Sequence, residues 1–185
     1  MPIVIRCDVR GQEGVIEAIK ALVDAGGAAR GKTLRAIRDV MVEGIRSRFK
    51  TQTSPDGIPW KPSLRARVEG GRTLVDKGLL RNSIMGAVNG NIASVWTASI
   101  YSAIHHFGGI IRAKNKPYLW FPMRATVKVV TSARGGMLKK PRRVSLTRWV
   151  RLKQVTIPAR PYMGLSEFDW AKITQVVDTV RLGVV

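Results

Sequence analysis

One stretch of the sequence has the residue pattern of a phosphate-binding loop. Residues 26–33 read Gly-Gly-Ala-Ala-Arg-Gly-Lys-Thr and match G-x-x-x-x-G-K-[ST]. In such a loop, backbone N–H groups surround the phosphates and the lysine reaches the terminal ones. The loop must follow a buried strand, whereas residues 13–25 have helical periodicity and include Glu17 and Asp24. We therefore interpret residues 26–33 as a Gly/Ala-rich link between two helices.

Other reactive side chains do not form a set. His105 and His106 are adjacent, so they point in different directions on a helix or a strand. No Cys, Asp or Glu lies within 25 residues of them to complete a metal site. Cys7 is the only cysteine, which excludes an intramolecular disulfide and favours a reducing compartment. We expect no catalytic residues, no metal and no cofactor, and hence not an enzyme.

The charge is concentrated in the second half of the sequence. The chain has a net charge of +20, and residues 77–166 carry 16 Lys and Arg with no Asp or Glu. Such a field attracts nucleic acid or an acidic protein surface. The densest part lies near Tyr118, Trp120 and Trp149, an arrangement that suits a phosphate backbone with base stacking. We call the following residues the basic arm: Arg134, Lys139, Lys140, Arg142, Arg143, Arg148, Arg151 and Lys153.

Three interpretations of the basic arm stay open. It could be a solvated hairpin whose charge serves solubility, a contact for an acidic neighbouring protein, or a direct contact for nucleic acid.

The spacing of apolar residues predicts the elements that hold these side chains. The segments 13–25 and 31–52 have helical periodicity, and the second has an apolar stripe. Asn89-Gly90 is typical of a hairpin turn. The remaining expected elements are a strand at 3–9, a helical turn leading to a strand at 74–84, a strand at 93–100, a helical turn at 101–107, and strands at 118–122, 126–131 and 149–157.

The last helix has a clear start signal. Ser166 is a good N-cap residue, and Asp169 follows at the spacing of a capping box. Leu165 and Trp170 are placed for a hydrophobic staple across the cap. Together the elements predict one α+β domain over 1–185, with helices at both ends packed on a central antiparallel sheet. Residues 112–156 are expected to form a projecting basic β-hairpin inserted in that domain. No apolar run is long enough to span a membrane.

Four segments carry a family resemblance. Arg-Phe at 48–49 precedes Ser-Pro-Asp-Gly-Ile-Pro-Trp-Lys-Pro at 54–62. Leu-Val-Asp-Lys-Gly-Leu-Leu-Arg-Asn-Ser-Ile follows at 74–84, and Ile-Tyr-Ser-Ala-Ile-His-His-Phe-Gly-Gly at 100–109. The last is Ile-Pro-Ala-Arg-Pro-Tyr-Met-Gly-Leu-Ser at 157–166. In this order and spacing they resemble the phage virion morphogenesis, or tail-completion, family of Mu-like contractile-tailed phages and related prophages.

The resemblance implies a structural, non-enzymatic virion protein. It implies tail completion at the head–tail junction, as a subunit of a neck or tail-terminator ring, with six copies matching the symmetry of a tail. The implied partners are copies of itself, adjacent connector and tail proteins, and packaged DNA in the central channel, with no membrane. The implied location is the virion, after assembly in the host cytoplasm. The alternative, favoured by charge alone, is a stand-alone basic nucleic-acid-binding protein.

Two of the four segments are stiffened by proline, which suits repeated contacts around a ring. The same stiffness would serve core packing within one domain, and both interpretations stay open. The candidate subunit contacts are Trp60, His106, Phe107, Arg160 and Tyr162. Lys77 and His106 depart from the residues usual in the family, Thr and Gln.

Overall fold

The structure of the protein is a computed structural model that describes residues 16–17, 28–129 and 142–181. Its helices are α2 (Ala28–Thr51), α3 (Leu64–Glu69), α4 (Leu79–Asn82), α5 (Ser102–Phe107) and α6 (Glu167–Arg181). Its strands are β1 (Ile84–Asn89), β2 (Ile92–Thr97), β3 (Gly109–Arg112), β4 (Leu119–Val129), β5 (Arg142–Leu152) and β6 (Gln154–Ile157). The expected strand at 3–9, with Cys7, and most of the expected helix at 13–25 lie outside the described residues.

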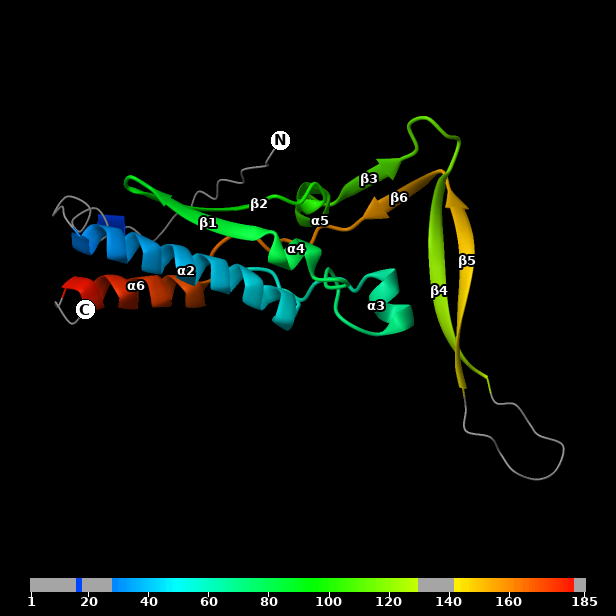
Figure 1. The fold of residues 1–185 in the computed structure, drawn as a ribbon, viewed down its shortest axis with the longest axis horizontal. Coiled ribbons are helices and arrows are strands. Elements are labelled where there is room, and N and C mark those ends of the chain that lie inside the picture. The colour runs from blue at the N-terminus through cyan, green and yellow to red at the C-terminus, as the bar shows by residue number, and fades with distance from the viewer. Residues whose placement is uncertain (1–15, 18–27, 130–141, 182–185) are drawn as a thin grey trace, which may run out of the picture.

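Two helices from distant parts of the sequence form one end of the molecule. The long helix α2 lies alongside α6, and the β1–β2 hairpin packs against α2 (Figure 1). Ile37 of α2 is buried against Ile173 and Val177 of α6, because the apolar stripes of the two helices face each other. The helix predicted at 31–52 and the hairpin predicted at Asn89-Gly90 are confirmed.

The strands form separate ribbons. Within the described residues, β1 pairs with β2, β3 with β6 and β4 with β5, each as an antiparallel two-stranded sheet. The α+β class is confirmed, but the strands do not join into one central sheet. The helix α5 lies between β2 and β3, so it separates the first ribbon from the second (Figure 1).

The strand boundaries after residue 117 differ from those expected. One continuous strand, β4, replaces the two predicted at 118–122 and 126–131. Pro122 fits within it because both strands of a two-stranded ribbon have a free edge, where a missing N–H costs little. The strand predicted at 149–157 is divided at Lys153, since residues 154–157 pair with β3 instead of β4.

The β4–β5 hairpin stands across the end of the molecule opposite the free end of the α2–α6 pair (Figure 1). Its strand β4 contacts α3. Because residues 130–141 lie outside the described part, the expectation that residues 112–156 form a projecting basic β-hairpin stays a prediction.

The start of α6 has the predicted capping box. The Asp169 backbone N–H donates to Ser166 Oγ over 3.2 Å, and the Ser166 backbone N–H donates to Asp169 Oδ2 over 2.9 Å. Leu165 and Trp170 both pack against the cluster of Ile37, Ile173 and Val177, as the predicted staple requires. No helix in the described ranges is both long enough and apolar enough to cross a membrane.

Candidate functional site

The four segments that carried the resemblance meet in the interior of the fold. Phe49 lies between Trp60 and Tyr162, with ring centroids 5.5 Å and 5.3 Å away. His106 stands edge-on to Tyr162 at 5.2 Å. The rings come from three of the four segments, since Phe49 and Trp60 share the first. The remaining segment, 74–84, contributes Leu80 and Ile84 to the same buried cluster. All four rings are buried, so the segments form one rigid hub.

Hydrogen bonds fix the polar edges of these rings. Trp60 Nε1 donates to the Pro161 carbonyl over 2.9 Å, and the Tyr162 hydroxyl donates to the Ser102 carbonyl over 3.2 Å. Burial raises the pKa of Tyr162 to about 12, although the hydrogen bond to Ser102 acts in the opposite direction. His106 Nδ1 accepts from the Tyr162 backbone N–H over 3.3 Å. Burial lowers the pKa of His106, which keeps this nitrogen an acceptor.

A buried ion pair joins α2 to α6 next to this hub. Arg48 Nη2 donates to Asp169 Oδ2, and both side chains are only 5% exposed. Arg48 Nη1 also donates to the carbonyls of Tyr162 and Gly164 over 3.0 Å and 2.9 Å. Arg48 therefore holds the turn between the proline-rich segment and α6, while its partner caps that helix.

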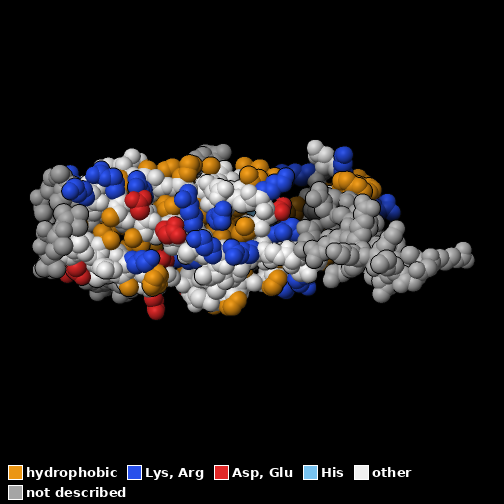
Figure 2. Space-filling model, turned by 60° about the horizontal axis from the view of Figure 1, so that its bottom comes forward, with side chains coloured by type: hydrophobic (Ala, Val, Ile, Leu, Met, Phe, Trp, Pro, Cys, Tyr) orange, Lys and Arg blue, Asp and Glu red, His pale blue; other side chains and the backbone are white. Residues whose placement is uncertain are grey.

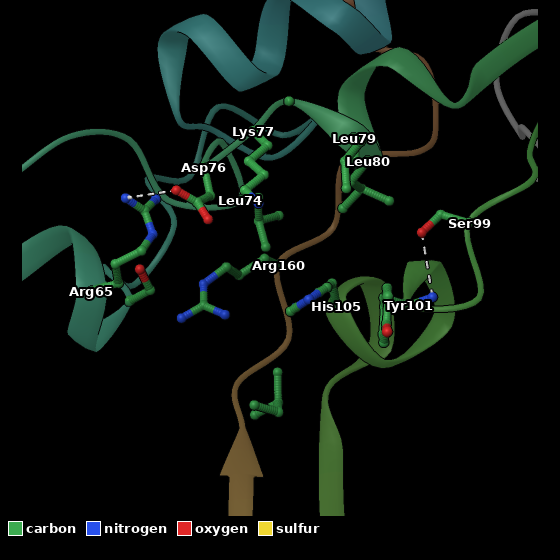
Figure 3. Close-up of a pocket in the computed structure, with 13 residues that line it drawn as sticks. Arg65, Leu74, Asp76, Lys77, Leu79, Leu80, Ser99, Tyr101, His105 and Arg160 are labelled. Carbon is green, nitrogen blue, oxygen red and sulfur yellow. Dashed lines mark hydrogen bonds and ion pairs between the residues drawn. The ribbon is translucent and has the colours of Figure 1, made fainter. Parts of the chain in front are cut away.

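A pocket of about 370 Å³ opens beside the hub (Figure 3). Segments far apart in the sequence line it, and they supply cationic, hydroxyl and apolar side chains. The lining residues are Ser63, Arg65, Leu74, Asp76, Lys77, Gly78, Leu79, Leu80, Ser99, Tyr101, His105, Ile157 and Arg160.

Arg160 is held in the wall of this pocket at two points. Its Nε donates to the Lys61 carbonyl over 2.8 Å, and its backbone N–H donates to the His105 carbonyl over 3.0 Å. The chain can approach α5 this closely because residue 108 is glycine: a Cβ there would lie 2.6 Å from the Ala159 nitrogen. Desolvation lowers the pKa of Arg160.

His105 lies next to Arg160 on the same wall. Its Nδ1 is buried and has no hydrogen-bond partner within the described residues. Desolvation, followed by the nearby charge of Arg160, lowers the pKa of His105, so the imidazole is neutral near pH 7. The wall therefore contains one fixed cation and, buried beside it, one polar nitrogen without a hydrogen-bond partner among the described residues.

The structure places the candidate subunit contacts unequally. Trp60, His106, Arg160 and Tyr162 are buried in this chain, which favours core packing over subunit contact for their side chains. Phe107, in contrast, is 63% exposed at the end of α5. Of these five residues, Phe107 is the one whose side chain is largely accessible to a second subunit, although its ring also packs against His106.

The basic arm is described in part. Arg134, Lys139 and Lys140 lie outside the described residues. Arg142, Arg143 and Arg148 lie on β5, while Arg151 and Lys153 are exposed near its end. The Arg151 guanidinium lies 5.6 Å from the centre of the Tyr118 ring. This cation–π contact agrees with the sequence, in which the basic residues lie near aromatic residues.

The interpretation of residues 26–33 as a link between two helices is wrong for residues 28–33, which are helical, while residues 26–27 lie outside the described residues. Residues 28–33 are the first turns of α2, and the Thr33 side chain is buried. A phosphate-binding loop needs this stretch to curve around its ligand and needs the hydroxyl to face a metal ion. Within the described ranges, no three His, Cys, Asp or Glu side chains are grouped as metal ligands.

Sequence reasoning missed the pocket and the buried ion pair. Arg48 and Arg160 both belong to the motif segments, but the motifs alone do not predict which groups their side chains contact. A signal was present for Arg48, since it falls between Ile45 and Phe49 on the apolar stripe of α2. No local signal links Arg48 to Asp169, which is 121 residues away.

Several large apolar side chains are exposed around α4 and α5. Leu79 is 73% exposed and Ile100 is 79% exposed, and Tyr101 and Phe107 flank α5. Figure 2 turns forward the side of the molecule that lies at the bottom of Figure 1, and on that face Lys and Arg side chains are prominent while Asp and Glu are sparse. Exposed apolar side chains rimmed by charge are typical of protein-binding surfaces.

Comparison with known proteins gives two matches. The phage virion morphogenesis family matches residues 11–180 of this chain. The chain is also similar to the Mu-like prophage FluMu G protein 2 of Haemophilus influenzae, with 30% identity over 105 residues. That alignment covers 57% of this chain and 71% of the relative. No solved structure matches the chain.

Proposed function

Because the chain belongs to the phage virion morphogenesis family, we propose that this structural virion protein completes the tail and helps join it to the DNA-filled head. In this proposal it works by assembly rather than by catalysis. The helical start of α2 in place of a phosphate loop supports that choice.

The exposed apolar side chains around α4 and α5 carry the proposal. We call Leu79, Ile100, Tyr101 and Phe107 the apolar rim. The aromatic rings of the motif segments are buried in the core, whereas these four apolar side chains remain exposed to solvent. Full burial of one such side chain contributes about 1.5–3 kcal/mol. Contact with another protein would recover that free energy.

A ring of identical subunits is the arrangement we propose for this contact. A closed ring needs head-to-tail interfaces, in which two different surfaces of the same chain meet. The apolar rim supplies one of these surfaces, and six copies would match a tail. Many weak contacts of the basic arm to a neighbouring connector or tail protein, or to DNA in the channel, would then add through avidity.

Complementation of a phage lacking this protein tests the proposal. Electron microscopy is expected to show tails and filled heads that fail to join, or tails of faulty length. The Leu79→Ser, Phe107→Ser double variant should fold normally and fail to restore joined particles. Ile58→Ser removes an equally exposed apolar side chain elsewhere and should restore them. Normal infectious virions without the protein would refute the virion role.

The charge of +20 favours a second candidate, a stand-alone nucleic-acid-binding protein. Changing Arg142, Arg143, Arg151 and Lys153 to Gln distinguishes the two. Loss of duplex binding with normal particle assembly would support the second candidate. Loss of head–tail joining supports the proposed function.

A further inference from the structure

The guanidinium of Arg160 is a buried cation without a counterion. Its side chain is only 4% exposed, and no Asp or Glu among the described residues pairs with it. Burying an unpaired charge is unfavourable by several kcal/mol unless an anion or hydrogen bonds compensate. The Nε atom has its partner in the Lys61 carbonyl, which leaves the terminal nitrogens directed toward the pocket.

The other residues that line the pocket add to its positive charge. Figure 3 shows Arg160 and His105 facing the same space, across from Lys77 and Leu74. Asp76 is the only acid in the lining, and its nearest cation is Arg65, 3.9 Å away. One carboxylate thus stands against three cations, so the pocket retains net positive charge.

From these contacts we infer that the pocket binds a carboxylate side chain, or a chain-terminal carboxylate, carried next to an apolar residue on a neighbouring virion protein. The carboxylate would lie against Arg160 and accept from its terminal N–H groups. The adjacent apolar residue would pack on Leu79, Leu80 and Tyr101. The inference rests on the proposed function only for the source of the segment.

The lining favours a peptide over a DNA backbone. A duplex presents a row of phosphates to an open cationic surface, and its bases are paired and stacked inside, so its backbone offers no apolar side chain to fill a pocket. Here five apolar side chains, Leu74, Leu79, Leu80, Ile157 and the ring of Tyr101, share the wall with the cations. A carboxylate beside an apolar side chain matches both parts of this lining.

The small molecule N-acetyl-L-leucine tests the site directly, because it carries one carboxylate and one apolar side chain. The full chain labelled with nitrogen-15 is titrated, and amide shifts of residues 77, 105 and 160 are followed by NMR. We expect saturable shifts with a Kd in the millimolar range. The uncharged N-acetyl-L-leucinamide should bind at least fivefold more weakly. Equal binding of the two compounds, or no saturable shift with either, would overturn the inference.

A matched pair of variants separates the pocket from general charge attraction. Lys77 and Lys114 are both exposed, and Lys114 lies beyond β3, outside the pocket lining. Lys77→Glu should weaken N-acetyl-L-leucine binding at least fivefold, whereas Lys114→Glu, with the same change in net charge, should alter it less than twofold. Equal weakening would overturn the inference. So would tighter binding of inorganic phosphate than of N-acetyl-L-leucine, because it would indicate a nucleic-acid backbone.

The outcome of these binding experiments is independent of the outcome of the particle-assembly experiment. If the pocket binds the carboxylate but phage lacking the protein assemble normally, the proposed function fails and the site stands. If head–tail joining requires the protein but N-acetyl-L-leucine causes no saturable shift, the proposed function is supported and the proposed binding site is refuted.

Discussion

The pair between Arg48 and Asp169 should be among the most sensitive points of the fold. Asp169→Asn keeps the size of the side chain and removes its charge, so the Arg48 guanidinium, which is only 5% exposed, loses the carboxylate of this ion pair. Breaking a buried pair in this way costs about 3–5 kcal/mol. The two carbonyl acceptors on Arg48 Nη1 remain, so we expect the lower half of that range.

Thermal unfolding followed by circular dichroism measures this loss. For a domain of 150–250 residues, each kcal/mol lowers Tm by roughly 2–4 °C, so the loss expected for Asp169→Asn should lower it by about 6–16 °C. Asp178→Asn, at an exposed position of the same helix, should change stability by less than about 0.5 kcal/mol. A loss below about 1 kcal/mol for Asp169→Asn would show that water compensates the charge and would refute the reasoning.

A double variant separates the ion pair from the helix cap. Arg48→Met together with Asp169→Asn removes both charges from the interior. If the unpaired guanidinium causes the loss, the double variant should be less destabilised than the sum of the two single variants, by at least about 1 kcal/mol. Strict additivity would instead assign the loss at Asp169 to its hydrogen bonds with Ser166.

Three further measurements examine the same hub. Gly44→Ala should cost about 1–3 kcal/mol in urea unfolding, because the added Cβ overlaps the Asp169 carboxylate; a neutral result would show that α6 can shift away. Trp60→Ala should cost about 3–5 kcal/mol by the same method, since it removes a buried ring and leaves the Pro161 carbonyl without its donor; a cost near that of a surface change would contradict the burial. Stability should be full above pH 6.5 and fall as the pH drops from 6.5 toward the folded-state pKa of His106, because that pKa is lowered and the unfolded chain binds more protons. Unfolding at pH 7.5 and 5.5 measures this pH dependence of stability. The His106→Gln variant should reduce it, and an equal pH dependence in the variant and the unmodified chain would show that His106 does not cause it.

Local features of the fold could be predicted from the sequence because short-range chemistry fixes them. The capping box of Ser166 and Asp169 requires only neighbouring residues, and the Asn89-Gly90 turn sets its own hairpin. The stripe from Leu34 to Phe49 determines which face of α2 is buried. The four motif segments were also recognised, although their shared location could not be derived from their spacing.

The arrangement of strands and the site depend on contacts between distant residues. Whether 154–157 continues the strand before it or pairs with β3 is decided by Gly108 and Arg160, which hold this segment against α5. The same applies to the pocket, because its walls come from segments on either side of the β4–β5 hairpin. Periodicity describes one element at a time and gives no information about which elements meet.

The order in which this chain is synthesised has a consequence for its assembly. Arg48 is made early, whereas Asp169 and the carbonyls of Tyr162 and Gly164 come late. In a growing chain on the ribosome that guanidinium therefore stays in water until α6 emerges, because these partners in the interior have not yet been made, and contacts of this separation close slowly. Unfinished chains would stay open and present no finished pocket. Partners that bind the closed shape would accordingly accept only completed subunits.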